Sequence, residues 1–174
     1  MASPLVAILM GSDSDLPTMA EVARVPEQYG VAYEIHVLSA HRSPAEAAAF
    51  ARDAERRGLR VIVAGAGGAA HLAGVMAAHT ILPVVGVPVD SSPLGGFDSL
   101  LSTVQMPPGI AVATVGVGTM GAKNAGHLAV GILALADPEL REKVRAARKR
   151  MAEEVLAKSR ALPERLREIL DRNK

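Results

Sequence analysis

The stretch that decides the fold reads A-G-A-G-G-A-A-H-L-A-G and occupies residues 64–74. It follows the branched apolar run 61–63, which is typical of a buried strand, and residues 69–79 are typical of a helix. The turn between them is nearly bare backbone, because it holds Gly65, Gly67 and Gly68. A strand that ends in glycines and opens a helix exposes unpaired N–H groups, which bind anions. The one titratable side chain in this stretch is His71, so the stretch predicts a ligand site.

The same pattern of strand, turn and helix repeats on both sides of this stretch. The sequence predicts five apolar strands, at residues 5–10, 33–38, 60–64, 83–89 and 110–117. Helices are expected at residues 17–29, 44–57, 69–79, 98–104 and 118–136. Alternating strands and helices form a parallel sheet with helices on both faces, and right-handed crossovers favour the flavodoxin-like order. We therefore expect an α/β fold, a three-layer α/β/α sandwich around a five-stranded parallel sheet.

Extra C-terminal helices are expected after this core. Asp137 and Pro138 are predicted to cap a helix with an apolar stripe at helical spacing, made of Leu140, Val144, Ala147, Met151 and Val155. A final short helix is expected to begin at Pro163. The chain is thus predicted to be a single domain of residues 1–174, with a core of 1–136 and a helical extension of 137–174 that packs on another subunit. Three glycines in the preceding helix predict the close approach of another backbone: Gly121, Gly126 and Gly131.

The composition argues against several classes of protein. A net charge of +1 implies no field for nucleic acid or a membrane surface, and the absence of Cys excludes disulfides and thiolate catalysis. Residues 61–89 carry no charge, but their glycines and prolines predict a fully buried strand–helix–strand unit rather than a membrane span. Residues 1–4 lack the features of a signal peptide, so a cytoplasmic location is expected.

Polar residues gather where the predicted strands end, and in doubly wound sheets ligands bind beyond the carboxyl ends of the strands. These ends are residues 11–15, 39–42, 65–71, 90–92 and 116–119. Ser12, Ser14 and Arg42 are donors suited to a phosphate, and Asp15 can accept hydrogen bonds from ribose hydroxyls. The alternative for the two serines and the aspartate is plain helix capping.

The loop after the second predicted strand carries a histidine and an arginine side by side. Ser43, with Glu46 three residues later, predicts a capping box that fixes His41 and Arg42 in a short loop. A histidine with a pKa near neutral can both give and take a proton. His41 and His71 are the only histidines at the predicted strand ends. Structural roles are expected for the others: His36, His79 and His127.

Two other kinds of site fit the sequence less well. Gly65-x-Gly67-x-x-Ala70, with Asp90 at the next strand end, resembles a dinucleotide fingerprint, but such a fingerprint usually follows the first strand. Asp15 and Asp90 are the only carboxylates considered as metal ligands, and they do not form a ligand set with the histidines. We therefore expect no cofactor and no metal.

Six ordered motifs give the chain a family resemblance. They are G-S-D-S-D from Gly11, S-A-H-R-S-P from Ser39, A-G-A-G-G-A-A-H-L-A-G from Ala64, G-V-P-V from Gly86, D-S-L-L-S-T-V-Q-M-P from Asp98 and G-A-K-N-A from Gly121. In these motifs the chain resembles the 5-(carboxyamino)imidazole ribonucleotide mutases of de novo purine biosynthesis. The resemblance implies an α/β/α sandwich that assembles as an octamer. It also implies a small ribonucleotide substrate, no cofactor, and transfer of a carboxylate from the exocyclic nitrogen to carbon 4 of an aminoimidazole ribonucleotide.

The resemblance also implies roles for individual residues. His41 matches the family's catalytic residue, and the substrate-binding positions are matched by Ser12, Ser14, Asp15, Ser39, Ala40, Arg42, Gly67 and His71. Two alternatives stay open. One is a carboxylase that uses free carbon dioxide on the same fold, whose members tend to carry Lys in place of Arg42. The other is a nucleotide-binding module without catalysis. Turnover of the carbamate without bicarbonate distinguishes the mutase from both.

Overall fold

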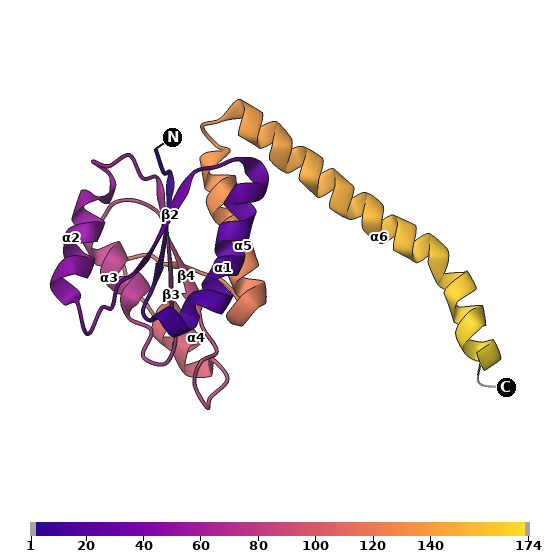
Figure 1. Cartoon of the computed structure of the whole chain (residues 1–174), viewed down its shortest axis with the longest axis horizontal. Coiled ribbons are helices and arrows are strands. Elements are labelled where there is room, and N and C mark those ends of the chain that lie inside the picture. Colours follow the sequence, from indigo (N-terminus) through magenta and orange to yellow (C-terminus); the bar gives the residue numbers. More distant parts are fainter. Residues whose placement is uncertain (1–2, 173–174) are drawn as a thin grey trace.

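The computed structural model describes residues 3–172 and shows a parallel sheet between two layers of helices (Figure 1). The strand order β2-β1-β3-β4-β5 confirms the predicted flavodoxin-like sandwich. The strands are β1 Val6–Met10, β2 Tyr33–Val37, β3 Val61–Ala66, β4 Val84–Pro88 and β5 Ala113–Thr114. The helices are α1 Leu16–Tyr29, α2 Pro44–Ala54, α3 Leu72–His79, α4 Phe97–Val104, α5 Gly118–Leu133 and α6 Pro138–Arg172, with a short 3-10 helix, η1 Asp13–Asp15. Residues 1 and 2, part of the start where no signal peptide is expected, lie outside the described residues.

Strand β1 lies inside the sheet, between β2 and β3, and all five of its residues are buried. Its alternate side chains point to opposite faces, as the pleat of a strand requires. Val6, Ile8 and Met10 belong to the core under α1 and α5, whereas Ala7 and Leu9 belong to the core under α2 and α3. Burial on both faces explains the continuous apolar runs in the sequence, and it leaves the loops at the strand ends free for function.

Helices α1 and α5 pack so closely that their contact requires a glycine. A Cβ added at Gly126 would lie 2.8 Å from the carbonyl oxygen of Val22 in α1. That carbonyl receives no helical hydrogen bond from residue 26, because this residue is Pro26, which has no N–H. The predicted close approach is therefore found at Gly126, and at Gly121 against the loop before α5, but both lie within the chain. At Gly131 no atom of this chain lies within 4 Å of an added Cβ, so no close approach is found there within the chain.

Strand β5 is much shorter than the predicted strand at residues 110–117, since only Ala113 and Thr114 pair with β4. Helix α4 packs tightly at this edge of the sheet. A Cβ at Gly86 of β4 would lie 2.4 Å from Cγ2 of Thr103 in α4. The hydroxyl of Thr114 donates to the carbonyl of Thr103 at 3.2 Å. At this edge of the sheet, β5 therefore contacts α4 as well as pairing with β4.

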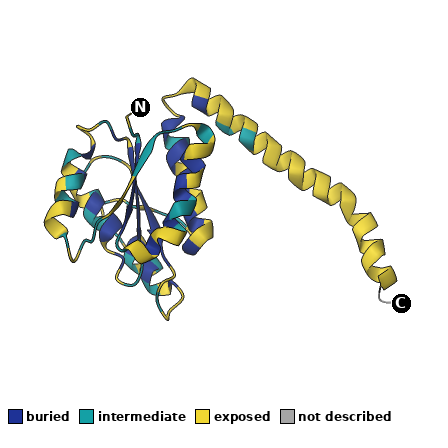
Figure 2. Cartoon of the chain, in the orientation of Figure 1, coloured by how far each residue is buried: buried dark blue, intermediate teal, exposed yellow. Residues whose placement is uncertain are grey.

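Helix α6 is one continuous helix of 35 residues, so the predicted break before Pro163 is wrong. It begins as predicted, with the carboxylate of Asp137 accepting from the N–H of Leu140 at 3.0 Å. Leu140 is buried against the core, but Met151 is already 54% exposed and the helix then projects away from the sheet (Figures 1 and 2). Pro163 has no N–H to donate to the carbonyl one turn earlier in the helix. That carbonyl lies on this exposed part of the helix, where it can accept a hydrogen bond from water. The predicted stripe therefore packs on the core only at its beginning.

The uncharged run at residues 61–89 forms β3, α3 and β4, as predicted. The expectation that this run is fully buried is wrong in the turn between α3 and β4, where Ile81 is 84% exposed. A turn at the amino-terminal edge of the sheet lies outside both helical layers, so its side chains meet solvent. Among residues 3–172, no helix is long and apolar enough to cross a membrane.

Candidate active site

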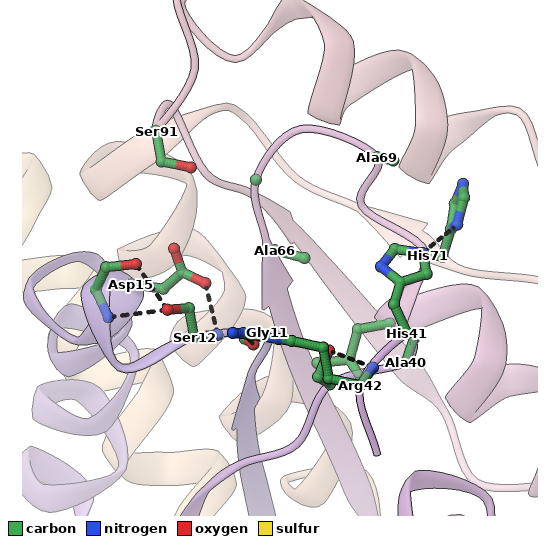
Figure 3. Close-up of a pocket in the computed structure, with 14 residues that line it drawn as sticks. Gly11, Ser12, Asp15, Ala40, His41, Arg42, Ala66, Ala69, His71 and Ser91 are labelled. Carbon is green, nitrogen blue, oxygen red and sulfur yellow. Dashed lines mark hydrogen bonds between the residues drawn. The ribbon is translucent and has the colours of Figure 1, made fainter. Parts of the chain in front are cut away.

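One cavity of about 210 Å³ lies at the carboxyl edge of the sheet, where the loops after β1, β2 and β3 meet (Figure 3). All the site residues predicted from the sequence line it: Ser12, Ser14, Asp15, Ser39, Ala40, His41, Arg42, Gly67 and His71. The other lining residues were not predicted individually. Four of them fall within the predicted strand ends, namely Gly11, Ala66, Ala69 and Ser91, and the fifth, Leu72, does not. Residues 116–119, at the fifth strand end, do not line this cavity, so that part of the expected convergence is wrong.

The loop after β1 forms the tight turn that presents two serines. The hydroxyl of Ser12 caps η1 by accepting from the N–H of Ser14 at 3.4 Å, while the N–H of Ser12 donates to the Asp15 carboxylate at 3.2 Å. The hydroxyl of Ser14 donates to that of Ser12 at 2.9 Å. Capping is therefore one role of Ser12 and Asp15. It also fixes both hydroxyls at the mouth of the cavity, and Ser14 itself is exposed.

Asp15 is the buried charge of this site, with only 4% of its surface exposed. Burial raises the pKa of Asp15 above its usual value, because a low dielectric disfavours the charged form. The hydrogen bond from Ser12 and the positive charge of Arg42 oppose this shift and lower the pKa, while the charge of Asp13 raises it. A carboxylate held in this way is a strong acceptor for a hydroxyl that enters the cavity.

The loop after β2 is organised by Ser39 rather than by the predicted capping box. The hydroxyl of Ser39 accepts from the N–H of Arg42 at 3.1 Å. Ser43 stands at the N-cap of α2 but makes no side-chain cap, so the capping box with Glu46 is wrong. The Ser43 hydroxyl is instead engaged by the Ser39 backbone, which donates to it at 2.9 Å and accepts from it at 3.1 Å. The hydrogen bonds between Ser39 and Ser43 therefore fix this loop in place of the capping box.

The guanidinium of Arg42 connects two of the loops. One terminal nitrogen donates to the carbonyl of Gly11 at 2.8 Å, and Nε lies 3.5 Å from the hydroxyl of Ser39. Arginine has five N–H donors in a rigid fork, so these contacts leave others free for an anion. Arg42 is exposed and stands between the Ser12–Asp15 side of the cavity and the two histidines (Figure 3).

The glycine loop after β3 forms another wall, and Gly67 is required there by packing. A Cβ at Gly67 would lie 1.9 Å from the hydroxyl oxygen of Ser91, which follows β4. Gly68 has a positive φ of 60°, and its carbonyl accepts from Ser102 of α4 at 3.1 Å. The small residues thus bring Ser91 into the cavity. A glycine repeat signals such an approach in a sequence, but it does not say which residue approaches.

His41 and His71 lie in direct contact. Nε2 of His41 is 2.7 Å from Nδ1 of His71, and the two rings are nearly perpendicular, at 75°. His41 comes from the loop after β2, and His71 stands at the N-cap of α3, where its side chain makes no cap hydrogen bond. Both side chains are exposed at the cavity. The sequence placed each histidine in a loop of this edge but did not predict that they pair.

The remaining histidines and the other candidate carboxylate lie outside this cavity. His36 stacks edge-on against Phe50, and His127 against Tyr29. Burial, aided by the charge of Arg148, lowers the pKa of His127. The Asp90 carboxylate lies at the start of α5, where a Cβ on Gly118 would come within 3.2 Å of it. Within residues 3–172, no three His, Cys, Asp or Glu side chains are grouped so that they could hold a metal ion.

Comparison with known proteins gives one consistent family. The model of the AIR carboxylase family matches residues 5–154. A protein of Pyrococcus horikoshii named N5-carboxyaminoimidazole ribonucleotide mutase is 56% identical over 161 residues, which cover 92% of this chain and 90% of that protein. A protein of the same name from Vibrio cholerae is 56% identical over 151 residues, or 87% and 94% of the two chains. The crystal structure of Treponema denticola PurE superposes with a TM-score of 0.79 at 28% identity, covering 88% of this chain and 95% of that one.

Proposed function

The chain belongs to the AIR carboxylase family, and we propose that it is an isomerase of purine biosynthesis, an N5-carboxyaminoimidazole ribonucleotide mutase. The reaction moves the carboxylate from the exocyclic nitrogen of the aminoimidazole ribonucleotide to ring carbon 4. The observation that carries this proposal is the cavity itself. Hydroxyls, one guanidinium, one buried carboxylate and a histidine pair meet there on three neighbouring strand ends.

Substrate binding is assigned to the side of the cavity that faces β1. Arg42, with free guanidinium donors, and the hydroxyls of Ser12 and Ser14 suit the phosphate of a ribonucleotide. Asp15 suits the ribose hydroxyls, because its carboxylate is buried beside this phosphate position and can accept hydrogen bonds. We assign the carboxylate to His71 and the base to the small residues Ala40 and Gly67, which let a planar ring lie against the main chain.

The chemistry requires one proton to be given and one to be taken. Protonation of the exocyclic nitrogen breaks its bond to the carboxylate and releases carbon dioxide and the aminoimidazole. Carbon 4 then attacks carbon dioxide, a carbon–carbon bond forms, and the proton on carbon 4 must leave. A single imidazole can donate the first proton and accept the second, so the enzyme ends as it began. We assign this role to His41, which the Ser39 turn holds at the cavity wall.

The alanine and glycine wall suits the intermediate. Carbon dioxide is neutral and apolar, and it must stay near carbon 4 until the new bond forms. Ala40, Ala66 and Ala69 line the cavity beside the histidine pair (Figure 3). Such a wall offers carbon dioxide no nucleophile, so it would hold the intermediate without binding it chemically.

A carboxylase that uses free carbon dioxide is the second candidate on this fold, and isotopic labelling separates the two. The purified protein is given the unlabelled carbamate in a buffer with ¹³C-bicarbonate. A mutase transfers the carboxylate within the cavity, so the expected 4-carboxylate product carries little ¹³C. Product labelled to the level of the bicarbonate would assign the carboxylase. No 4-carboxylate product, whether from the carbamate or from free carbon dioxide, would leave only nucleotide binding. The protein with His41→Asn is the control for the non-enzymatic reaction.

We also propose that the chain assembles as a homo-oligomer, an octamer as in the resemblance, with residues 1–136 as the core and 137–174 as an extension that packs on other subunits. Two observations support this. The cavity of about 210 Å³ is smaller than the ~300–1,000 Å³ usual for ligand pockets, so one chain covers only part of a ribonucleotide. Beyond Ala147, helix α6 is exposed along its whole described length (Figure 2). The cytoplasmic location stays a prediction.

A further inference from the structure

The contact between His41 and His71 determines which ring nitrogen can carry a proton. It joins Nε2 of His41 to Nδ1 of His71 at 2.7 Å, so one proton lies on one of these two nitrogens. A neutral imidazole has one N–H and one bare nitrogen, whereas an imidazolium has two N–H groups. When both rings are neutral, the direction of this single hydrogen bond therefore decides which nitrogen of each ring carries the proton.

His71 stands at the amino end of a helix, where it faces the aligned N–H groups of the first turn. His71 is the N-cap of α3, and a positive charge is unfavourable at the amino end of a helix. Two charged side chains also line the cavity, Arg42 and Asp15, and their charges are opposite in sign. The acid role stays with His41, as the proposed function assigns it.

The proton cycle then fixes the direction of the bond. When His41 is the acid, it has an N–H on both nitrogens, so its Nε2–H must find a bare Nδ1 on His71. When His41 has given its other proton away, the same Nε2–H can stay in place. The opposite direction would set two N–H groups against each other in the charged state. Only a hydrogen bond donated by His41 to His71 is compatible with both the charged and the neutral state of His41.

We propose that His71 is a positioning residue whose Nδ1 accepts from Nε2–H of His41, so that His41 exchanges protons with the substrate through Nδ1. In Figure 3 the free nitrogen of the His41 ring points away from His71, toward the side of the cavity that holds Asp15 and Ser12. This inference rests on the proposed function and names the reacting atom within it. The second nitrogen of His71, as Nε2–H, remains a donor for the substrate carboxylate.

Two substitutions of His71 separate its two nitrogens. Asn sets an amide oxygen near the position of Nδ1 and has nothing at Nε2, whereas Gln reaches the position of Nε2 and leaves Nδ1 empty. We expect His71→Asn to keep kcat within about threefold and to raise KM. We expect His71→Gln to lower kcat by roughly 100-fold, the lower end of the range for acid–base catalysis, with a smaller change in KM. His79→Asn, at the far end of α3 and outside the cavity, is the matched control and should match the unchanged protein.

The opposite pattern, kcat lost in His71→Asn and kept in His71→Gln, would overturn the proposal, and so would equal kcat in both. Melting curves of the variants check that α3 still folds. Because the side chain of His71 makes no cap hydrogen bond, we expect similar midpoints.

Nitrogen-15 NMR of the histidine rings tests the hydrogen bond without any turnover. At a pH where both rings are neutral, the proposed direction leaves the proton on Nε2 in His41 and also on Nε2 in His71. The reverse direction would leave it on Nδ1 in both rings and would overturn the proposal. A protein with the expected tautomers but no conversion of the carbamate would contradict the proposed function and not this geometry, so the two failures can be told apart.

Discussion

At the scale of single residues, Asp15 couples substrate binding to stability. Its folded pKa is raised, chiefly by burial, above the reference value of 3.8. A raised pKa means that the folded state binds the proton more tightly, so the stabilisation is present below about pH 3.8 and is lost as the pH rises through the folded pKa. At neutral pH the ionised side chain therefore costs stability.

We expect Asp15→Asn to melt at a higher temperature than the unchanged protein at pH 7, with the difference shrinking toward pH 4. The same change should weaken ribonucleotide binding, since the amide is a poorer acceptor. Thermal unfolding followed by circular dichroism across this pH range measures the first effect, and titration calorimetry measures the second. Asp13→Asn, at the exposed neighbour in the same turn, is the control. A lower melting temperature at pH 7 for Asp15→Asn would contradict this account.

A separate prediction concerns Arg42, because its guanidinium both donates to the protein backbone and lines the cavity. One nitrogen is held by the carbonyl of Gly11 while others face the cavity. Lysine keeps the charge but cannot make both contacts, so Arg42→Lys should raise KM by roughly tenfold, the scale of one charged hydrogen bond, and change kcat less. Steady-state kinetics give both constants, with Arg52→Lys on the exposed side of α2 as control. Collapsed kcat at an unchanged KM would place Arg42 in the chemistry instead.

At the scale of elements, the contact between α1 and α5 sets a steric limit at one position. An added Cβ at Gly126 lies 2.8 Å from a backbone carbonyl, which cannot move without moving α1. Gly126→Ala should destabilise the protein by about 1–3 kcal/mol, the scale of overpacking, despite the better helix propensity of alanine. Gly131→Ala in the same helix meets nothing within 4 Å and should stabilise by roughly 0.5–1 kcal/mol. Chemical denaturation of the two variants gives the comparison, and equal effects would show that the helices are not in tight contact.

The elements also show where sequence reasoning reaches its limit. Local sequence patterns were enough to predict β1 to β4 and the start of α6, because buried strands and helix caps are determined by residues adjacent in the sequence. They failed for β5, where α4 packs against the strand, and for Pro163, whose missing hydrogen bond is harmless on an exposed helix. Ser43 failed in the same way. The Ser39 backbone competes for its hydroxyl, and only the folded loop brings the two together.

At the scale of the whole molecule, the cavity could be predicted as a set of residues but not as a set of contacts. The parallel sheet places all strand ends at one edge, which is why the predicted residues line one cavity. His41 follows β2 and His71 follows β3, with β1 between them, so the rings must meet across roughly 9–10 Å of sheet. Nothing in the local sequence of either loop specifies that the two rings come into contact. Ser91 falls within the predicted strand end at residues 90–92, but its role as a lining residue was not predicted, since its place is determined by the bare backbone of Gly67.

Helix α6 is the feature that one chain does not explain. Its exposed apolar residues recur on one face at helical spacing and continue far from the core: Met151, Val155, Leu162, Leu166 and Ile169. An isolated helix gains most of its stability from packing such a face, so we expect other copies of the chain to cover it.

We predict that light scattering at micromolar concentration finds an oligomer, and that the double change Leu166→Glu with Ile169→Glu lowers its mass. The changes Arg165→Glu with Arg167→Glu are the control for added negative charge at equally exposed positions of the same helix. A stable monomer of the unchanged protein would contradict the assembly.

The most direct test of the central claim is the rate of His41→Asn. Asparagine keeps one donor and much of the shape, so folding and substrate binding should stay close to those of the unchanged protein. Conversion of the carbamate to the 4-carboxylate and exchange of the proton at carbon 4 should both fall by roughly a hundredfold or more, the usual effect of losing a general acid–base. Both rates staying near those of the unchanged protein in His41→Asn, while His71→Asn abolishes them, would contradict the assignment of His41 as the proton shuttle.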